Sequence, residues 1–334
     1  MKVNWDIERL RGIAILFVLI HHLPHVTGTG YGRFYHWFNP WTGVDLFFVI
    51  SGFIVTKTFL ESRQSLGTFF IRRIFRIVPL ALAWVLIPLG LSLWLPGLPA
   101  TKELAYDLLT VSTATFNLAD AFGIHHGVLA PYWSLSIEQQ FYLVLPFLLF
   151  LRNRTAVLIA AIAFITFALR PAMIYAGFDA NVQHKFSLLK FDTLAAGVLL
   201  YFFPPKLNFN RWTLVVLCAA VGVLPAVIAP EFHVRRYMYA LPLITLASAS
   251  LVAAAAQNKN RFPRFLDWFG SRSYALYLVH WPAIWFAGGS VWRFAAIVFC
   301  LAELSHRLIE RPMISVGKML ASGRVSEPAP APAS

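Results

Sequence analysis

Charged residues are scarce in this chain of 334 residues: Asp, Glu, Lys and Arg together make up only 13% of it. Soluble globular domains carry about twice that share, so the composition excludes an ordinary soluble enzyme. Cysteine is nearly absent as well: Cys218 and Cys300 both fall within apolar segments, so nothing indicates a disulfide framework, and both are expected to pack in the membrane core. No small-residue cleavage pattern follows the first apolar run, and we expect this run to be retained and not removed as a signal peptide.

Apolar residues dominate instead, since 58% of the chain is hydrophobic and 16% is aromatic. About ten segments are long enough to cross a hydrocarbon core that is about 30 Å thick. They cover residues 10–26, 42–60, 75–95, 132–151, 155–172, 187–203, 213–229, 236–256, 270–288 and 291–309. We therefore expect an all-α fold, a polytopic transmembrane helix bundle of about ten spans, in a domain of residues 1–318. Residues 319–334 end in a Pro/Ala-rich run and are predicted to form a disordered cytoplasmic tail.

The net charge of +13 does not indicate a nucleic-acid partner, because Lys and Arg lie mainly at span ends. With ten spans, most of the 28 basic residues fall on the side of the two termini. The positive-inside rule then places both termini in the cytoplasm and the chain in the cell (inner) membrane, with the lipid bilayer as a partner. This topology treats residues 97–131 as a long outer connection, amphipathic or re-entrant, because polar residues such as Lys102 and Asp107 interrupt it.

The first span, WDIERLRGIAILFVLIHHLPH (residues 5–25), carries an arginine near its start and two histidines near its end. On an α-helix Arg11 and His22 lie within about 20° of one face and about 16 Å apart along the axis, whereas His21 points about 100° away. Ionisable side chains inside a bilayer are costly and usually face a bundle interior or a cavity. The span is therefore predicted to line a functional cavity. His21 and His25 have a spacing that suits a metal, but no third ligand is evident, so no metal site is expected.

The ionisable residues inside the spans sort by depth into two layers. An outer layer is predicted to hold His22, Asp45, Glu138, Asp192 and His280, which can carry or move protons. An inner layer is basic and is predicted to hold Arg11, Arg73 and Arg76, of which the last two share a helix face. Guanidinium groups suit bidentate phosphate contacts, so this layer is a candidate site for the charged end of a phosphorylated cytoplasmic ligand.

Structural interpretations stay open for several of these residues. Arg73 and Arg76 also fit a positive-inside cluster at a span end. Asp45 and Asp192 also fit structural ion pairs with basic residues. His280 also fits a core histidine with satisfied hydrogen bonds, and Trp133 fits an interfacial aromatic belt as well as a binding role.

Seven segments taken together resemble a known family, the integral-membrane acyltransferase family 3. They are LRGIAILFVLIHH, GVDLFFVISGFIV, FIRRIFRIVP, YWSLSIEQQFYLVLP, KFDTLAAGVLL, SYALYLVHWP and IERP, and they run from one end of the chain to the other. The resemblance implies transfer of an acyl group, usually acetyl from cytoplasmic acetyl-CoA, to a hydroxyl of a glycan or glycosylated acceptor. It also implies essential roles for Arg11, His22, Arg73 and Arg76, and it matches the acidic positions of two motifs with Asp45 and Glu138.

The chemistry of acyl transfer agrees with that resemblance. A base must take the proton of the acceptor hydroxyl, and a neutral histidine is suited to this task. We predict His22 as the base and either Asp45 or Glu138 as the carboxylate that orients it. Arg11, Arg73 and Arg76 are predicted to bind the acyl-CoA. The candidates for binding the sugar-bearing acceptor are Trp133, Ser134, Tyr142, Asp192 and His280, and the outer loops around residues 27–41, 97–131, 173–186 and 230–236 are predicted to set its specificity.

A different class of protein also fits the buried acids and histidines. A proton-coupled transporter or flippase of a cell-envelope glycan precursor would use such groups as a proton relay. Transporters of this kind often contain internal repeats, and we find no convincing repeat in the sequence. Turnover of a thioester distinguishes the two hypotheses, because only the enzyme releases free CoA in an acceptor-dependent manner.

Overall fold

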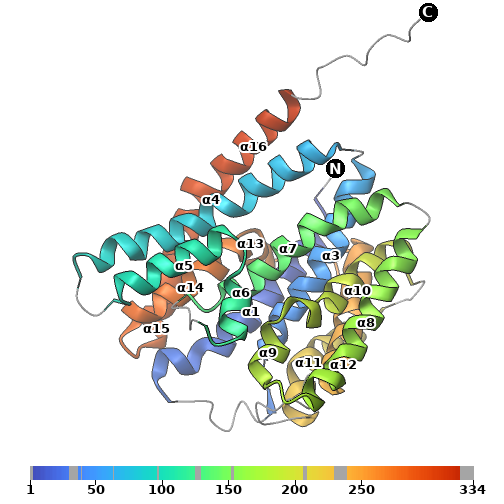
Figure 1. The fold of residues 1–334 in the computed structure, drawn as a ribbon, viewed down its shortest axis with the longest axis horizontal. Helices are drawn as coiled ribbons and strands as arrows, with labels where there is room; N and C mark the ends of the chain where they lie inside the picture. The colour runs from blue at the N-terminus through green and yellow to red at the C-terminus, as the bar shows by residue number, and fades with distance from the viewer. Residues whose placement is uncertain are drawn as a thin grey trace, which may run out of the picture.

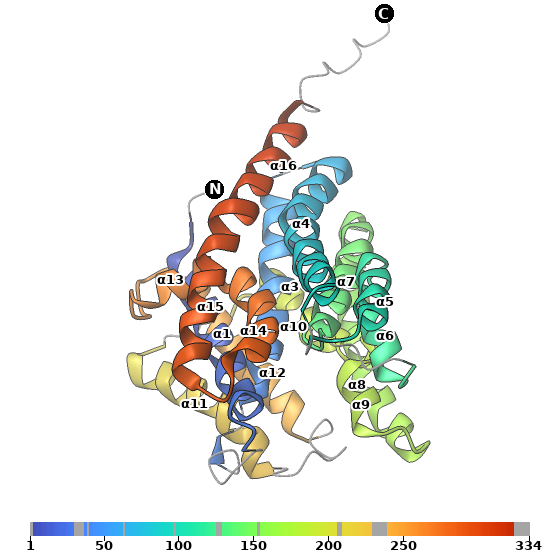
Figure 2. The same ribbon diagram turned by 90° about the vertical axis from the view of Figure 1, so that its left-hand side faces the viewer.

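A computed structural model describes residues 3–29, 37–38, 40–62, 64–95, 98–124, 129–151, 154–205, 209–228 and 239–323. Every regular element in these ranges is a helix, as the sequence predicts. In chain order the elements are α1 (Trp5–Thr27), η1 (Pro40–Thr42), α3 (Gly43–Glu61), α4 (Leu66–Ser92), α5 (Thr101–Ser112), α6 (Phe116–Ala121), α7 (Tyr132–Phe150), α8 (Thr155–Tyr175), α9 (Ala180–Lys185), η3 (Ser187–Leu189), α10 (Phe191–Phe202), α11 (Arg211–Ile228), α12 (Leu241–Ala256), α13 (Leu266–Ser271), α14 (Ser273–Ala287), α15 (Val291–Ser305), the π-helical η5 (His306–Glu310) and α16 (Arg311–Gly323). Figures 1 and 2 show them as one bundle.

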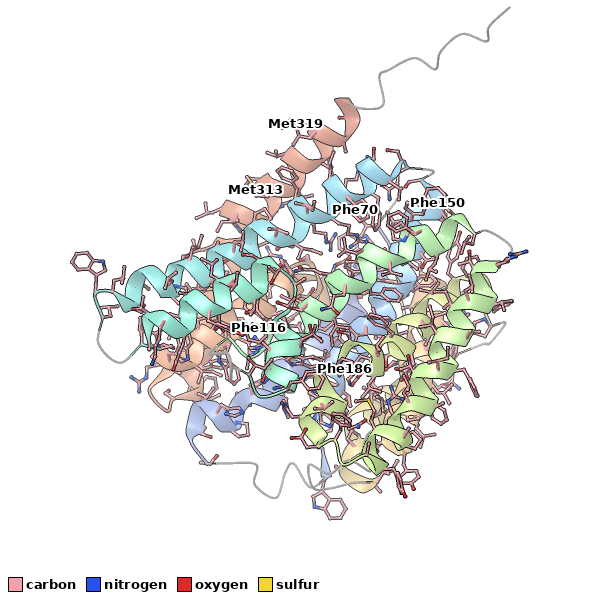
Figure 3. All side chains as sticks on the ribbon, in the orientation of Figure 1. Phe70, Phe116, Phe150, Phe186, Met313 and Met319 are labelled. Atoms are coloured by element: carbon pink, nitrogen blue, oxygen red, sulfur yellow. The ribbon has the colours of Figure 1, made fainter. Side chains whose placement is uncertain are left out.

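Each predicted span overlaps one of these helices, so the helical bundle is confirmed. By length and composition, five helical segments among the described residues could cross a membrane. They are α1, the continuous segment formed by η1 and α3 (Pro40–Glu61), α4, α8 and α11. The helices α10 and α12 are apolar but shorter. Large apolar side chains point outward around the bundle (Figure 3). On α8, for example, Val157 and Phe164 are 69% and 70% exposed, as expected for a helix whose outer face contacts lipid.

Helices α1 and α3 form the centre of the bundle, since both contribute to each of its two hydrophobic clusters. One cluster joins them to α4, α7, α14, α15 and most of α10, and the other joins them to the end of α10 and to α11, α12 and α13. Glycines permit the closest crossings. A Cβ on Gly197 of α10 would lie 2.1 Å from the carbonyl oxygen of Val49 on α3, and one on Gly270 of α13 would lie 1.8 Å from that of Glu8 on α1. The glycines therefore fix how α10 and α13 pack against the central pair.

The long connection predicted over residues 97–131 contains α5 and α6 in its described part. Helix α5 lies along the second half of α4 (Figure 1) and buries Leu104, Asp107 and Val111 while it exposes Leu109, so it is amphipathic as predicted. The carboxylate of Asp107 is buried and accepts a hydrogen bond of 3.1 Å from the backbone N–H of Leu129. This bond ties α5 to the start of α7.

The last predicted span continues beyond its expected end. Helices α15, η5 and α16 form one continuous rod, and α16 packs along the first half of α4 where both project from the bundle (Figure 2). The tail was predicted to begin at residue 319, but α16 extends to Gly323. The first residues of the predicted tail are therefore helical, and residues 324–334 lie outside the described residues.

Candidate active site

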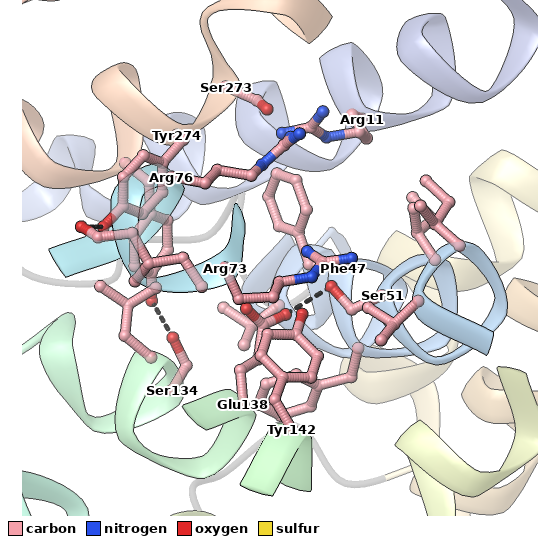
Figure 4. A pocket seen from close by; sticks show the side chains of 18 residues that line it. Arg11, Phe47, Ser51, Arg73, Arg76, Ser134, Glu138, Tyr142, Ser273 and Tyr274 are labelled. Atoms are coloured by element: carbon pink, nitrogen blue, oxygen red, sulfur yellow. Dashed lines mark hydrogen bonds between the residues drawn. The ribbon is translucent and has the colours of Figure 1, made fainter. Parts of the chain in front are cut away.

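Arg11 and His22 line two neighbouring cavities along α1. The inner cavity has a volume of about 110 Å³ and lies among α1, α3, α4, α7 and α14 (Figure 4). Its polar lining comes from Arg11, Ser51, Arg73, Arg76, Ser134, Glu138, Tyr142, Ser273, Tyr274 and Tyr277. The prediction that the three arginines converge is thus confirmed, because they come from two helices and line a single cavity.

The arginines are held in different ways. The Nη1 atom of Arg11 lies 3.2 Å from both carboxylate oxygens of Glu8, one turn earlier on α1. The guanidinium of Arg73 lies 5.0 Å from the centre of the Tyr142 ring, within range of a cation–π contact. Among the described residues, no ion pair is formed by Arg73 or Arg76. Because like charges face one another here, the cavity is suited to an anion.

Glu138 lies in this inner cavity and not beside His22. Its carboxylate accepts a hydrogen bond of 2.6 Å from the hydroxyl of Ser51, and it lies within electrostatic range of Arg11 and Arg73. The predicted place in the outer layer was therefore wrong. The distance of a residue from the end of its own helix does not give its depth in the bundle, because the helices are tilted against one another (Figure 1).

The outer cavity has a volume of about 190 Å³ and contains His22. The Nδ1 atom of His22 lies 2.8 Å from the carbonyl oxygen of Val18. A carbonyl can only accept, so Nδ1 carries the proton and Nε2 is left with a free lone pair. The ring of His22 also lies edge-on to Trp281, with 5.3 Å between centroids. In this tautomer the imidazole can serve as a base at Nε2.

Asp45 does not orient His22. Its carboxylate oxygen lies 2.9 Å from the Nζ of Lys190, and both side chains are fully buried. The ammonium also lies 5.3 Å from the ring centre of Trp41 and 5.9 Å from that of Trp133. Asp45 lines neither the inner nor the outer cavity. The prediction that Asp45 or Glu138 orients His22 is therefore wrong for both residues. The orienting group is instead the carbonyl of Val18.

Asp192 and His280 are likewise held by structural contacts. Asp192 forms a 2.6 Å ion pair with Arg170, which confirms the structural interpretation of this aspartate. The Nδ1 atom of His280 lies 2.6 Å from the carbonyl oxygen of Tyr277, and the side chain is fully buried. Neither residue lines the inner or the outer cavity. His280 nevertheless adjoins the base, since its ring centre lies 5.0 Å from that of His22.

The two cavities meet at Val44 and Tyr277, which line both. The hydroxyl of Tyr277 donates to the carbonyl of Pro131 at 2.9 Å and lies 2.6 Å from the Oγ of Ser134. These bonds hold the tyrosine across the boundary, with Ser134 on the inner side. The other predicted acceptor-binding residues divide between the cavities: Tyr142 lines the inner one and Trp133 the outer one.

Sequence reasoning missed Ser51, Tyr277 and Lys190. The first two lie within the segments GVDLFFVISGFIV and SYALYLVHWP, but neither is ionised, and sorting by charge passed over them. Lys190 precedes Asp192 in KFDTLAAG, and its distance of 145 residues from Asp45 along the chain hid the pairing. In the part of the chain that the structure describes, no group of three or more His, Cys, Asp or Glu residues could hold a metal ion.

Comparison with known proteins agrees with this geometry. A family model described as an acyltransferase domain matches residues 4–305, which is most of the chain. The chain therefore belongs to this family of membrane acyltransferase domains, the one whose motifs its sequence resembles.

Among curated proteins, the chain is similar to the peptidoglycan O-acetyltransferase OatA of Listeria monocytogenes. The identity is 26% over 358 residues, which cover 92% of this chain and 55% of that protein. It is also 26% identical over 364 residues to the O-acetyltransferase OatA of Staphylococcus aureus, with 93% and 57% covered. The chain thus spans about half the length of these relatives. No solved structure matches it.

Proposed function

We propose that the chain is a membrane-embedded O-acyltransferase that moves an acyl group, most simply acetyl, from cytoplasmic acyl-CoA to a hydroxyl of a glycan or glycosylated acceptor. One observation carries the proposal: a cavity lined by Arg11, Arg73 and Arg76 adjoins a cavity that contains the free Nε2 of His22. Anionic phosphates fit the first cavity, and a general base fits the second. Peptidoglycan is the acceptor named for the Listeria relative, and we extend that acceptor class to this chain.

In the proposed reaction the arginines bind the diphosphate of CoA, and the pantetheine arm passes Tyr277 toward His22. The separation of Arg11 and His22, about 16 Å along the helix, is close to the reach of an extended pantetheine arm. His22 takes the hydroxyl proton at Nε2 as the acceptor oxygen attacks the thioester carbonyl. The new C–O bond then replaces the C–S bond, and the CoA thiolate leaves and is protonated. Glu138 balances part of the charge of the arginines, and the hydroxyl of Ser51 donates a hydrogen bond that holds the Glu138 carboxylate in place.

We also propose that all ten predicted spans cross the membrane and that both termini are cytoplasmic. The overlap of each span with a helix and the excess of basic residues on the side of the termini support this topology. The inner cavity, which the three arginines line and which we call the arginine cavity, then opens toward the cytoplasm, where acyl-CoA is found. The outer cavity, which contains His22 and which we call the histidine cavity, lies on the side of the glycan.

Mass spectrometry of surface glycans tests the proposal. Cells with the wild-type protein are expected to show an acyl mass shift on the glycan, and cells without the protein or with His22→Gln at equal membrane abundance are not. A shift that persists with His22→Gln removes His22 from its role as base. Transport of a glycan precursor into vesicles without release of CoA contradicts the acyltransferase assignment and supports the transporter hypothesis.

A further inference from the structure

A third cavity lies next to the arginine cavity, toward the start of α1. Its volume is about 340 Å³, and it is formed between the start of α1 and the end of α3. The polar residues of its lining are Asn4, Glu8, Lys57, Thr58 and Glu61. Ile54 lines both this cavity and the arginine cavity, and the ion pair between Glu8 and Arg11 joins one lining to the other. The two cavities are therefore neighbours along the same two helices.

Among the residues that the structure describes, Lys57 is the only cation in the lining of this third cavity. Its ammonium lies 5.9 Å from the ring centre of Phe53, and among the described residues it forms no ion pair. The two carboxylates of the cavity compete weakly with an anion. Glu8 is neutralised by Arg11, and Glu61 is exposed at the end of α3, where water screens its charge. Lys57 is thus available to a ligand.

We propose that Lys57 binds the 3′-phosphate on the ribose of CoA, so that the third cavity holds the nucleotide end of the donor. This inference rests on the proposed function, in which the arginines bind the diphosphate. The thioester must then extend toward His22, and the ribose must extend the opposite way. From Ser51 in the arginine cavity to Lys57 the helix rises about 9 Å in that opposite direction. A phosphate monoester needs a cation at this place, and Lys57 supplies it.

The test compares two donors that differ only in this phosphate. Initial rates are measured with acetyl-CoA and with acetyl-dephospho-CoA for the wild type, Lys57→Met and the control Arg72→Gln. Arg72 lies on α4 beside Arg73, but its side chain is exposed and contacts Gln64. The wild type and Arg72→Gln are expected to have a KM about tenfold lower for acetyl-CoA than for the dephospho donor. In Lys57→Met this ratio is expected to fall to about one, with kcat unchanged.

Equal effects of Lys57→Met on both donors, or no effect on either, would overturn the inference. Binding of CoA and of dephospho-CoA to the purified protein, measured by calorimetry, gives the same comparison without turnover. If the wild type binds CoA in preference to dephospho-CoA through Lys57 but transfers no acyl group, the proposed function fails and the phosphate site stands. An anionic lipid offers the same phosphate chemistry. If Lys57→Met abolishes stabilisation by phosphatidic acid while the donor ratio stays at the wild-type value, the ligand is the lipid and the inference is wrong.

Discussion

The pair of Asp45 and Lys190 distinguishes a structural role from a catalytic one. The substitution Asp45→Asn removes the carboxylate that lies 2.9 Å from a fully buried ammonium. Breaking a buried ion pair on one side typically costs about 3 to 5 kcal/mol, because the remaining charge has lost its compensation. We expect a loss of this size in the free energy of unfolding, which corresponds to a fall in Tm on the order of ten degrees.

A second variant and a control sharpen this test. Asp45→Asn combined with Lys190→Met removes both charges, and replacing a buried pair by uncharged groups is often close to neutral. The double variant is therefore expected to recover most of the lost stability. Arg307 is the matched control, since its side chain is 67% exposed in an ion pair with Glu303. Arg307→Ala is expected to change stability by less than about 1 kcal/mol.

Thermal unfolding of the detergent-solubilised proteins measures these differences, and acyl transfer is assayed on the same samples. If Asp45 instead oriented His22, Asp45→Asn would abolish transfer while it left Tm close to that of Arg307→Ala. Adding Lys190→Met would then recover no stability, because Asp45→Asn would not have left the ammonium without its compensating charge. Either result would refute the reasoning from the ion pair.

Other contacts give further predictions. Gly197→Ala forces α10 away from α3 and is expected to cost about 1 to 3 kcal/mol in thermal unfolding; Gly90→Ala, whose Cβ meets nothing within 4 Å, is expected to be neutral or to stabilise the helix by up to about 1 kcal/mol. Arg73→Lys keeps the charge but loses the stacking on the Tyr142 ring and the proposed forked contact with the donor phosphate, so the KM for acetyl-CoA is expected to rise about tenfold in steady-state assays. Tyr277→Phe removes the hydrogen bond to the carbonyl of Pro131 and is expected to lower the free energy of unfolding by about 1 kcal/mol; unchanged stability would contradict a structural role for this bond.

The sequence was sufficient to predict the helices and the convergence of the arginines. Hydropathy over membrane-length windows identifies the helices, because a span must satisfy its backbone hydrogen bonds internally. The helical period places Arg73 and Arg76 on one face, and the charge bias puts that face at the same level as Arg11. Each of these properties belongs to a single helix. They can be predicted because the helical period fixes the direction in which each side chain points around its own helix axis.

The partners of the acidic residues could not be predicted in this way. Asp45 pairs with Lys190, and Glu138 accepts a hydrogen bond from Ser51. Both pairings depend on how the helices rotate and tilt against one another. Glycine crossings such as that of Gly197 with Val49 set this arrangement, and glycine carries no hydropathic signal that shows which helix it will meet. Both acids therefore have partners other than His22: Lys190 for Asp45 and Ser51 for Glu138.

The central pair of helices links the three cavities in a fixed order. Along α1, Glu8 lines the third cavity, Arg11 the arginine cavity and His22 the histidine cavity. Along α3 the order runs the other way, from Val44, which lines both the histidine cavity and the arginine cavity, to Lys57 in the third cavity. Two antiparallel helices thus define one path along which the proposed phosphate-binding cations precede the proposed base. Under the proposed function, a donor held at Lys57 and Arg11 extends its thioester along these two helices toward His22, because the arginine cavity adjoins the third cavity on one side and the histidine cavity on the other.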